Sequence, residues 1–146
     1  MNEFEIVAVI DCPVPIVFGG LVDVEKSPDW NPGVDEVRRT SDGALGVGST
    51  VTFIGRFLGR HFESPSECTA FLVDHQFTTK TSSGPFDLEV GYTLEPVDGG
   101  TRVTTVYRGE SKGFFKIAEP VVFRLTKNQA EKSMETLKEL LEADAI

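Results

Sequence analysis

The sequence predicts an α+β fold in which a curved antiparallel sheet of about seven strands wraps around one long C-terminal helix. Three observations predict it. Apolar residues alternate at period two over residues 2–11, a strand–turn–strand pattern runs from residue 34 to about 110, and the last third of the chain changes to helical spacing. Short links between strands favour antiparallel pairing. Only the last segment is long enough to cover the apolar face of the sheet, so the sheet should curve around it.

The first strand and two short helices are predicted at the N-terminal end. Residues 2–11 alternate apolar side chains with acids, which is typical of a strand with one solvated face. Pro13 suits the entry to a helix, and Gly19–Gly20 weakens that helix, so it should be short. The stretch SPDWNPGV, residues 27–34, predicts a turn or a single helical turn, and it holds the one tryptophan, Trp30.

Six further strands follow, at about residues 34–40, 49–57, 61–74, 75–82, 86–96 and 101–110. Turn signals separate them, and the VDGG sequence before the last strand is typical of a hairpin. Pro65 falls inside the longest of these segments. A proline within a strand indicates an edge position or a bulge, because it cannot donate a backbone hydrogen bond.

Residues 113–146 predict one long helix, with Pro120 in its first turns or at a kink. Its inward stripe carries large residues at both ends, Phe123 on one side and Leu137 on the other. The positions between them are small: Thr126, Ala130 and Ser133. Small residues there should leave space between helix and sheet, which predicts an internal cavity. The alternative is that neighbouring phenylalanines fill the space.

Composition and charge narrow the class of protein. A chain of 146 residues suits one domain over residues 1–146, and a net charge of -9 with only 14 scattered Lys and Arg disfavours nucleic acid as a partner. Stable membrane insertion is not expected, because no apolar run reaches about 18 residues. No signal peptide is apparent, so we expect a cytoplasmic protein, monomeric or weakly dimeric.

No metal and no cofactor are expected. His61 and His75 lack a third ligand at metal-site spacing, and the two cysteines show no metal-binding pattern. The sequence has no phosphate-binding or dinucleotide-binding loop.

Three segments resemble the polyketide cyclase/dehydrase-type domains of the SRPBCC superfamily, which includes START lipid-transfer domains and birch-pollen-allergen-like proteins. They are CPVPIVFGGLVDVEKSPDWNPGV at 12–34, LEPVDGGTRVT at 94–104 and LKELLEA at 137–143. The resemblance spans nearly the whole chain in the order of the family. It implies the helix-grip fold, and binding or transport of a small hydrophobic molecule such as a lipid, polyketide, sterol or quinone.

The expected ligand-binding wall combines the inner strand faces with the small-residue stretch of the helix, with Trp30 closing one end. Its predicted members are Trp30, Phe53, Phe57, Phe86, Leu88, Tyr92, Thr105, Tyr107, Phe123, Ala130 and Met134. Weak catalytic candidates are the hydroxyls of Tyr92 and Tyr107, together with Glu67. The last would act as a base of raised pKa if a bulge at Pro65 turned it inward.

Two alternatives to simple binding remain open at this stage. The first is an enzyme, namely a polyketide cyclase, aromatase or dehydrase, which would hold a reactive chain in shape with a few polar groups. The second is a protein-interaction module with a filled core. Binding is favoured because no nucleophile or acid–base motif stands out in the sequence.

Overall fold

A computed structural model describes residues 2–81, 83 and 86–144, and it confirms the α+β fold class. The elements are β1 (Asn2–Ile10), α1 (Val14–Val22), the 3-10 helix η1 (Val24–Asp29), β2 (Val34–Arg39), β3 (Thr50–Phe57), β4 (Arg60–Leu72), β5 (Gln76–Thr81), β6 (Phe86–Val97), β7 (Gly100–Ser111), α2 (Phe114–Ile117) and α3 (Glu119–Glu142).

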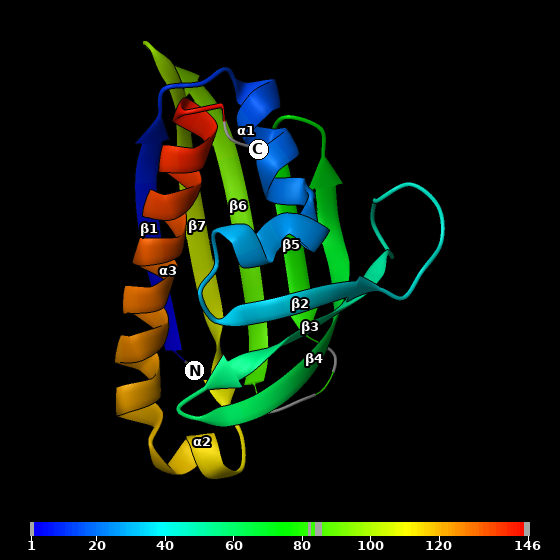
Figure 1. The fold of residues 1–146 in the computed structure, drawn as a ribbon, viewed down its shortest axis with the longest axis vertical. Helices are drawn as coiled ribbons and strands as arrows, with labels where there is room; N and C mark the ends of the chain where they lie inside the picture. Colours follow the sequence, from blue (N-terminus) through cyan, green and yellow to red (C-terminus); the bar gives the residue numbers. More distant parts are fainter. Residues whose placement is uncertain (1, 82, 84–85, 145–146) are drawn as a thin grey trace.

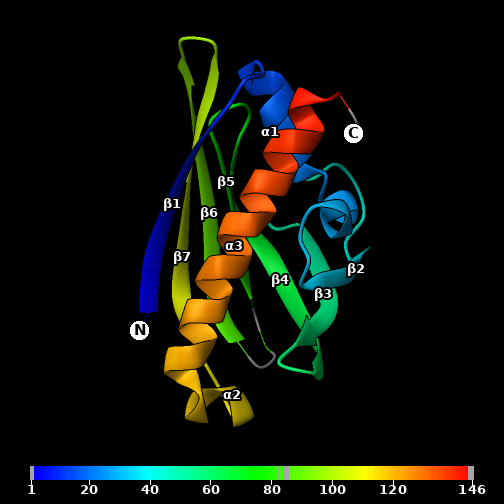
Figure 2. The ribbon, with the colours of Figure 1, turned by 60° about the vertical axis from the view of Figure 1, so that its left-hand side comes forward.

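The seven strands form one antiparallel sheet in the order β1-β7-β6-β5-β4-β3-β2. Every strand from β2 to β7 therefore lies beside its neighbour in the chain, as the short turns predict, and β1 joins the open side of β7. The sheet curves so that α3 lies across its concave face (Figures 1 and 2). Helix α1 covers the end where α3 finishes, and α2 lies at the opposite end (Figure 1).

The expected single helix over residues 113–146 is divided in two. The short helix α2 begins after Gly113, whose φ of 60° lies in the left-handed region, and Ala118 separates it from α3. Pro120 stands in the first turn of α3. In a continuous helix its ring would clash with the carbonyl of Lys116 and its missing N–H would break a bond, so the helix restarts there. None of the helices that the structure describes is long and apolar enough to cross a membrane.

Pro65 lies in β4, which pairs with β3 on one side and β5 on the other. On the β3 side Pro65 lies opposite Thr52, and the described pairs with β5 begin at Ser66. A bulge is present, but it falls later, between Cys68 and Ala70. The proline is thus accommodated without turning its neighbour inward.

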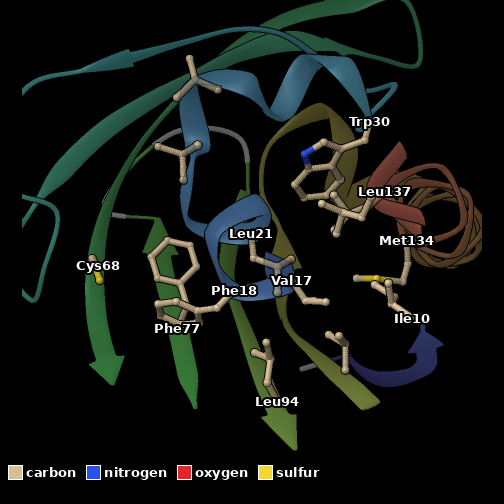
Figure 3. Packing of buried hydrophobic residues seen from close by; sticks show 14 of the residues in the cluster. Ile10, Val17, Phe18, Leu21, Trp30, Cys68, Phe77, Leu94, Met134 and Leu137 are labelled. Carbon is tan, nitrogen blue, oxygen red and sulfur yellow. The ribbon is translucent and has the colours of Figure 1, made fainter. Parts of the chain in front are cut away.

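The interior beneath α1 is a filled core (Figure 3). Helix α1 buries Val17, Phe18 and Leu21, and the last turns of α3 meet them with Leu137 and other fully or nearly fully buried residues. Gly20 permits this approach, because a Cβ at that position would come within 3.1 Å of a Leu141 methyl group. A side chain at position 20 would therefore require Leu141 to shift by a few tenths of an ångström.

Substituting a residue of this filled core should destabilise the protein far more than substituting one from the middle of α3. Leu137 is 0% exposed, so Leu137→Ala should lower the free energy of unfolding by about 2–5 kcal/mol through lost contacts and a new cavity. Thr126→Ala, about three turns earlier, should change it by less than about 1 kcal/mol. Urea unfolding followed by circular dichroism measures the free energy of unfolding of both variants. Equal losses would contradict the division of the interior into a filled and a hollow half.

Candidate ligand cavity

A cavity of about 210 Å³ lies between the concave face of the sheet and the first half of α3. The residues of α3 that line it are Val122, Phe123, Thr126, Gln129, Ala130 and Ser133. Beyond Ser133 the same face of the helix carries Met134, Leu137 and Leu141, which belong to the filled core. The cavity thus begins where the side chains of α3 become small, because short side chains there cannot reach the sheet.

Aromatic side chains form a large part of the cavity wall. They are Phe4, Trp30, Phe53, Phe57, Phe62, Phe77, Phe86, Tyr92, Tyr107 and Phe123. Several hold one another in place: Phe4 stacks on Tyr107 with ring centroids 4.8 Å apart, and Phe77 stacks on Tyr92 at 6.4 Å. At the α2 end, Phe115 packs against Phe86 at 5.0 Å and closes the aromatic cluster. Such contacts give the wall a defined shape.

A strip of small hydroxyl residues crosses the wall on β4 and β5, and the sequence reasoning missed it. Ser64 and Ser66 stand two residues apart on β4, and Thr79 and Thr81 stand two residues apart on β5; all four line the cavity. Their period-two spacing was the signal that could have placed them on the inner face. The Thr81 hydroxyl donates to the Phe86 carbonyl at 3.0 Å and accepts from the Leu88 N–H at 2.8 Å, so it serves the backbone.

Tyr92 and Tyr107 form a pair of phenols on neighbouring strands β6 and β7. Burial raises the pKa of Tyr107 to about 12. Burial also raises the pKa of Tyr92 well above its usual value, and the charge of Tyr107 and a hydrogen bond with it add to the effect. Both tyrosines line the cavity, and part of each side chain is therefore accessible there. At neutral pH both hydroxyls are therefore uncharged.

Trp30 both packs the core and lines the cavity. It is 5% exposed, directly follows η1 and projects inward beside Leu137 (Figure 3). Its backbone N–H bonds to the Ser27 carbonyl at 3.1 Å, and Pro28 lies within η1, which together fix the turn. The indole N–H has no hydrogen-bond partner among the described residues. The two interpretations of this tryptophan, packing and cavity wall, are thus both satisfied.

Polar contacts lie at the margins of the cavity. Where the turn after η1 meets α3, the amide of Gln129 lies so close to Gly33 that any Cβ there would overlap it. At the opposite end, Asn2 donates a hydrogen bond to Glu119, and Lys116 lies 3.4 Å from the same carboxylate. Lys116 also pairs with Glu110, at 3.9 Å, on the rim of the cavity.

The structure brings most of the predicted wall residues together around the cavity. Those that line it are Trp30, Phe53, Phe57, Phe86, Leu88, Tyr92, Tyr107, Phe123 and Ala130. Two expected members do not. Met134 is one helical turn beyond Ala130 and packs in the filled core, while Thr105 is 2% exposed, lies behind the cavity surface and leaves its hydroxyl without a partner among the described residues.

Glu67 lies on the outer face of β4 and is exposed. Ser66 and Cys68, on either side of it, are buried, since the strand still alternates at this point and its bulge comes afterwards. The geometric basis for an inward base at Glu67 is therefore missing. His61 and His75 are also exposed, and no cluster of three potential metal ligands occurs in the part of the chain that the structure describes.

The sequence matches one family model, described as polyketide cyclase / dehydrase and lipid transport, over residues 1–142. The chain belongs to this family. None of the curated proteins compared with it matches its sequence.

Several solved structures share this fold at low sequence identity. The protein TTHA0849 from Thermus thermophilus is 17% identical, with a TM-score of 0.84 over 99% of this chain and 100% of that chain. A START superfamily protein from Mycobacterium smegmatis is 16% identical, with a TM-score of 0.84 over 98% and 99%. The Zhui aromatase/cyclase from Streptomyces sp. R1128 is 13% identical, with a TM-score of 0.78 over 97% and 93%. These likenesses establish a shared helix-grip fold.

The tyrosine pair should resist ionisation in the folded protein. The chain contains two tyrosines, so the near-ultraviolet absorbance of tyrosinate reports this pair alone. An exposed tyrosine ionises near pH 10. Here we expect no tyrosinate at pH 10 and a rise near pH 12 for Tyr107, with the normal midpoint restored in urea. The folded protein binds these phenol protons more tightly than the unfolded chain does. The contribution of the neutral pair to the free energy of unfolding is therefore fully present below about pH 10 and is lost as pH rises through the folded pKa. Ionisation of both phenols near pH 10 in the native state would contradict this placement.

Proposed function

We propose that the protein binds a small hydrophobic molecule in the cavity between the sheet and α3. The observation that carries this proposal is a hollow of about 210 Å³ beneath Thr126, Ala130 and Ser133, with many aromatic side chains in its wall. A concave and largely apolar space with a few polar groups is the usual form of a small-molecule site. The family description, which includes lipid transport, agrees with this role.

Catalysis of polyketide cyclisation is the second candidate, and the tyrosine pair is the observation that favours it. Two neutral phenols inside the cavity could donate hydrogen bonds to a ketone of a folded chain. Cyclisation also requires removal of a proton from carbon, and among the described lining residues Glu110 is the only carboxylate, exposed at the rim beside Lys116. Simple binding is therefore the better-supported function. A loss of turnover on a polyketide substrate in Tyr107→Phe would favour the enzyme instead.

A protein-interaction module with a filled core is less well supported, because the interior beside the first half of α3 is hollow. The remaining parts of the proposal follow from the sequence alone. They are one domain over residues 1–146, a cytoplasmic location, and a monomer or weak dimer that acts without metal or cofactor.

Filling the cavity from α3 should abolish binding. Ala130 is 6% exposed and lines the hollow, so Ala130→Trp would place an indole in the space that a ligand needs. We expect calorimetric titration with 2-naphthol, a neutral two-ring probe, to show at least a ~10-fold loss of affinity. Ala130→Leu should give an intermediate loss with less risk to the fold.

The matched control is Glu131→Trp, which adds the same side chain at the adjacent exposed position. It should leave affinity for 2-naphthol unchanged, and thermal unfolding of all three variants shows that they remain folded. Failure of 2-naphthol to bind the wild-type protein, or equal binding by Ala130→Trp, would refute the proposed function.

A further inference from the structure

The cavity offers no positive charge to a ligand. None of the described residues that line it is a lysine, arginine or histidine. The one carboxylate there, on Glu110, already has Lys116 beside it at 3.9 Å, and the chain as a whole carries a net charge of -9. An anion moved from water into this space would be buried without a counter-ion, which is strongly unfavourable. The cavity should therefore reject carboxylates such as fatty acids.

The volume of the cavity limits the size of the ligand. Pockets for drug-sized molecules are typically ~300–1,000 Å³, whereas this one measures about 210 Å³. Phe86 and Phe115 pack together at the α2 end, and Trp30 and Leu21 belong to the wall nearest the filled core. One or two fused rings fit these limits, whereas a four-ring sterol does not.

The tyrosine pair provides the place for a polar group. Two neutral phenols that bond to each other use one of their two O–H groups, so the second is left for another acceptor. The hydrogen bonds of the described residues supply no such acceptor for either tyrosine. Phe4 stacks on Tyr107 and Phe77 stacks on Tyr92, which restricts the orientation of both phenol rings. A ligand oxygen at this point would satisfy the remaining donor.

We propose, building on the proposed function, that the cavity selects an uncharged molecule of one or two rings whose hydroxyl, carbonyl or amide oxygen binds at Tyr92 and Tyr107. The selection against anions arises from the lack of a cation in the described wall, and the selection for size from the cavity volume of about 210 Å³.

A pair of probes of matched shape tests the charge selection. 2-Naphthamide and 2-naphthoate differ mainly in charge at pH 7, so calorimetric titration of the wild-type protein with each isolates the effect of charge. We expect the amide to bind at least ~10-fold more tightly than the carboxylate. Equal or tighter binding of 2-naphthoate would overturn the proposal, and loss of that binding in Lys116→Met would identify the rim lysine as the unforeseen partner.

Size and polar contact are tested separately. 17β-Estradiol, a neutral four-ring phenol, should bind at least ~10-fold more weakly than 2-naphthol. Combining Tyr92→Phe with Tyr107→Phe should weaken 2-naphthol by roughly tenfold while leaving naphthalene unchanged, since only the former loses a hydrogen bond. Thr93→Val, which removes an exposed hydroxyl beside Tyr92, is the control and should alter neither probe.

The outcomes separate this proposal from the one on which it rests. If 2-naphthol binds and Ala130→Trp prevents it, the cavity is a ligand site. In that case equal affinities for the amide and the carboxylate, or for 2-naphthol and estradiol, would refute only the stated selectivity. An unchanged affinity in the double phenylalanine variant would refute the role of the tyrosine pair.

Discussion

The buried face of α3 changes side-chain size halfway along the helix, and the interior of the protein follows that change. From Met134 onwards large side chains reach the sheet and α1, and this end is filled. Before that point Thr126, Ala130 and Ser133 stop short of the sheet, and this end is hollow. One helix thus fixes the fold and maintains a cavity, because the distance between helix and sheet is set where the packing is tight. The hollow half is held open by the filled half.

Glycines allow close approaches at two places in the fold. Gly20 lets α1 settle against Leu141. On the other side of the molecule, a Cβ at Gly55 would overlap the carbonyl oxygen of Gly33, at the point where the register between β2 and β3 shifts. Each glycine permits two segments to touch where a side chain would force them apart.

Much of this architecture could be predicted from the sequence, because it depends on local periodicity. Alternation predicted all the strands, and small residues between Phe123 and Leu137 predicted the hollow. Predictions failed where tertiary context decides. The side chains of Thr105 and Met134 point inward as expected, but both residues lie outside the cavity. The pattern that shows which side chains point inward does not show where the filled core ends. The serines at 64 and 66 went unrecognised because Pro65 between them obscured the strand register.

The cavity has an energetic consequence for whatever enters it. Unfilled space beside a core is unfavourable, because the residues that line it lack the contacts that packing would supply. Water can occupy the hydroxyl strip on β4 and β5, but the phenylalanines opposite offer it few hydrogen bonds. A molecule with rings for the aromatic wall and one oxygen for the tyrosines satisfies both surfaces at once. Its binding energy would then come largely from a deficit in packing that the fold of α3 builds in.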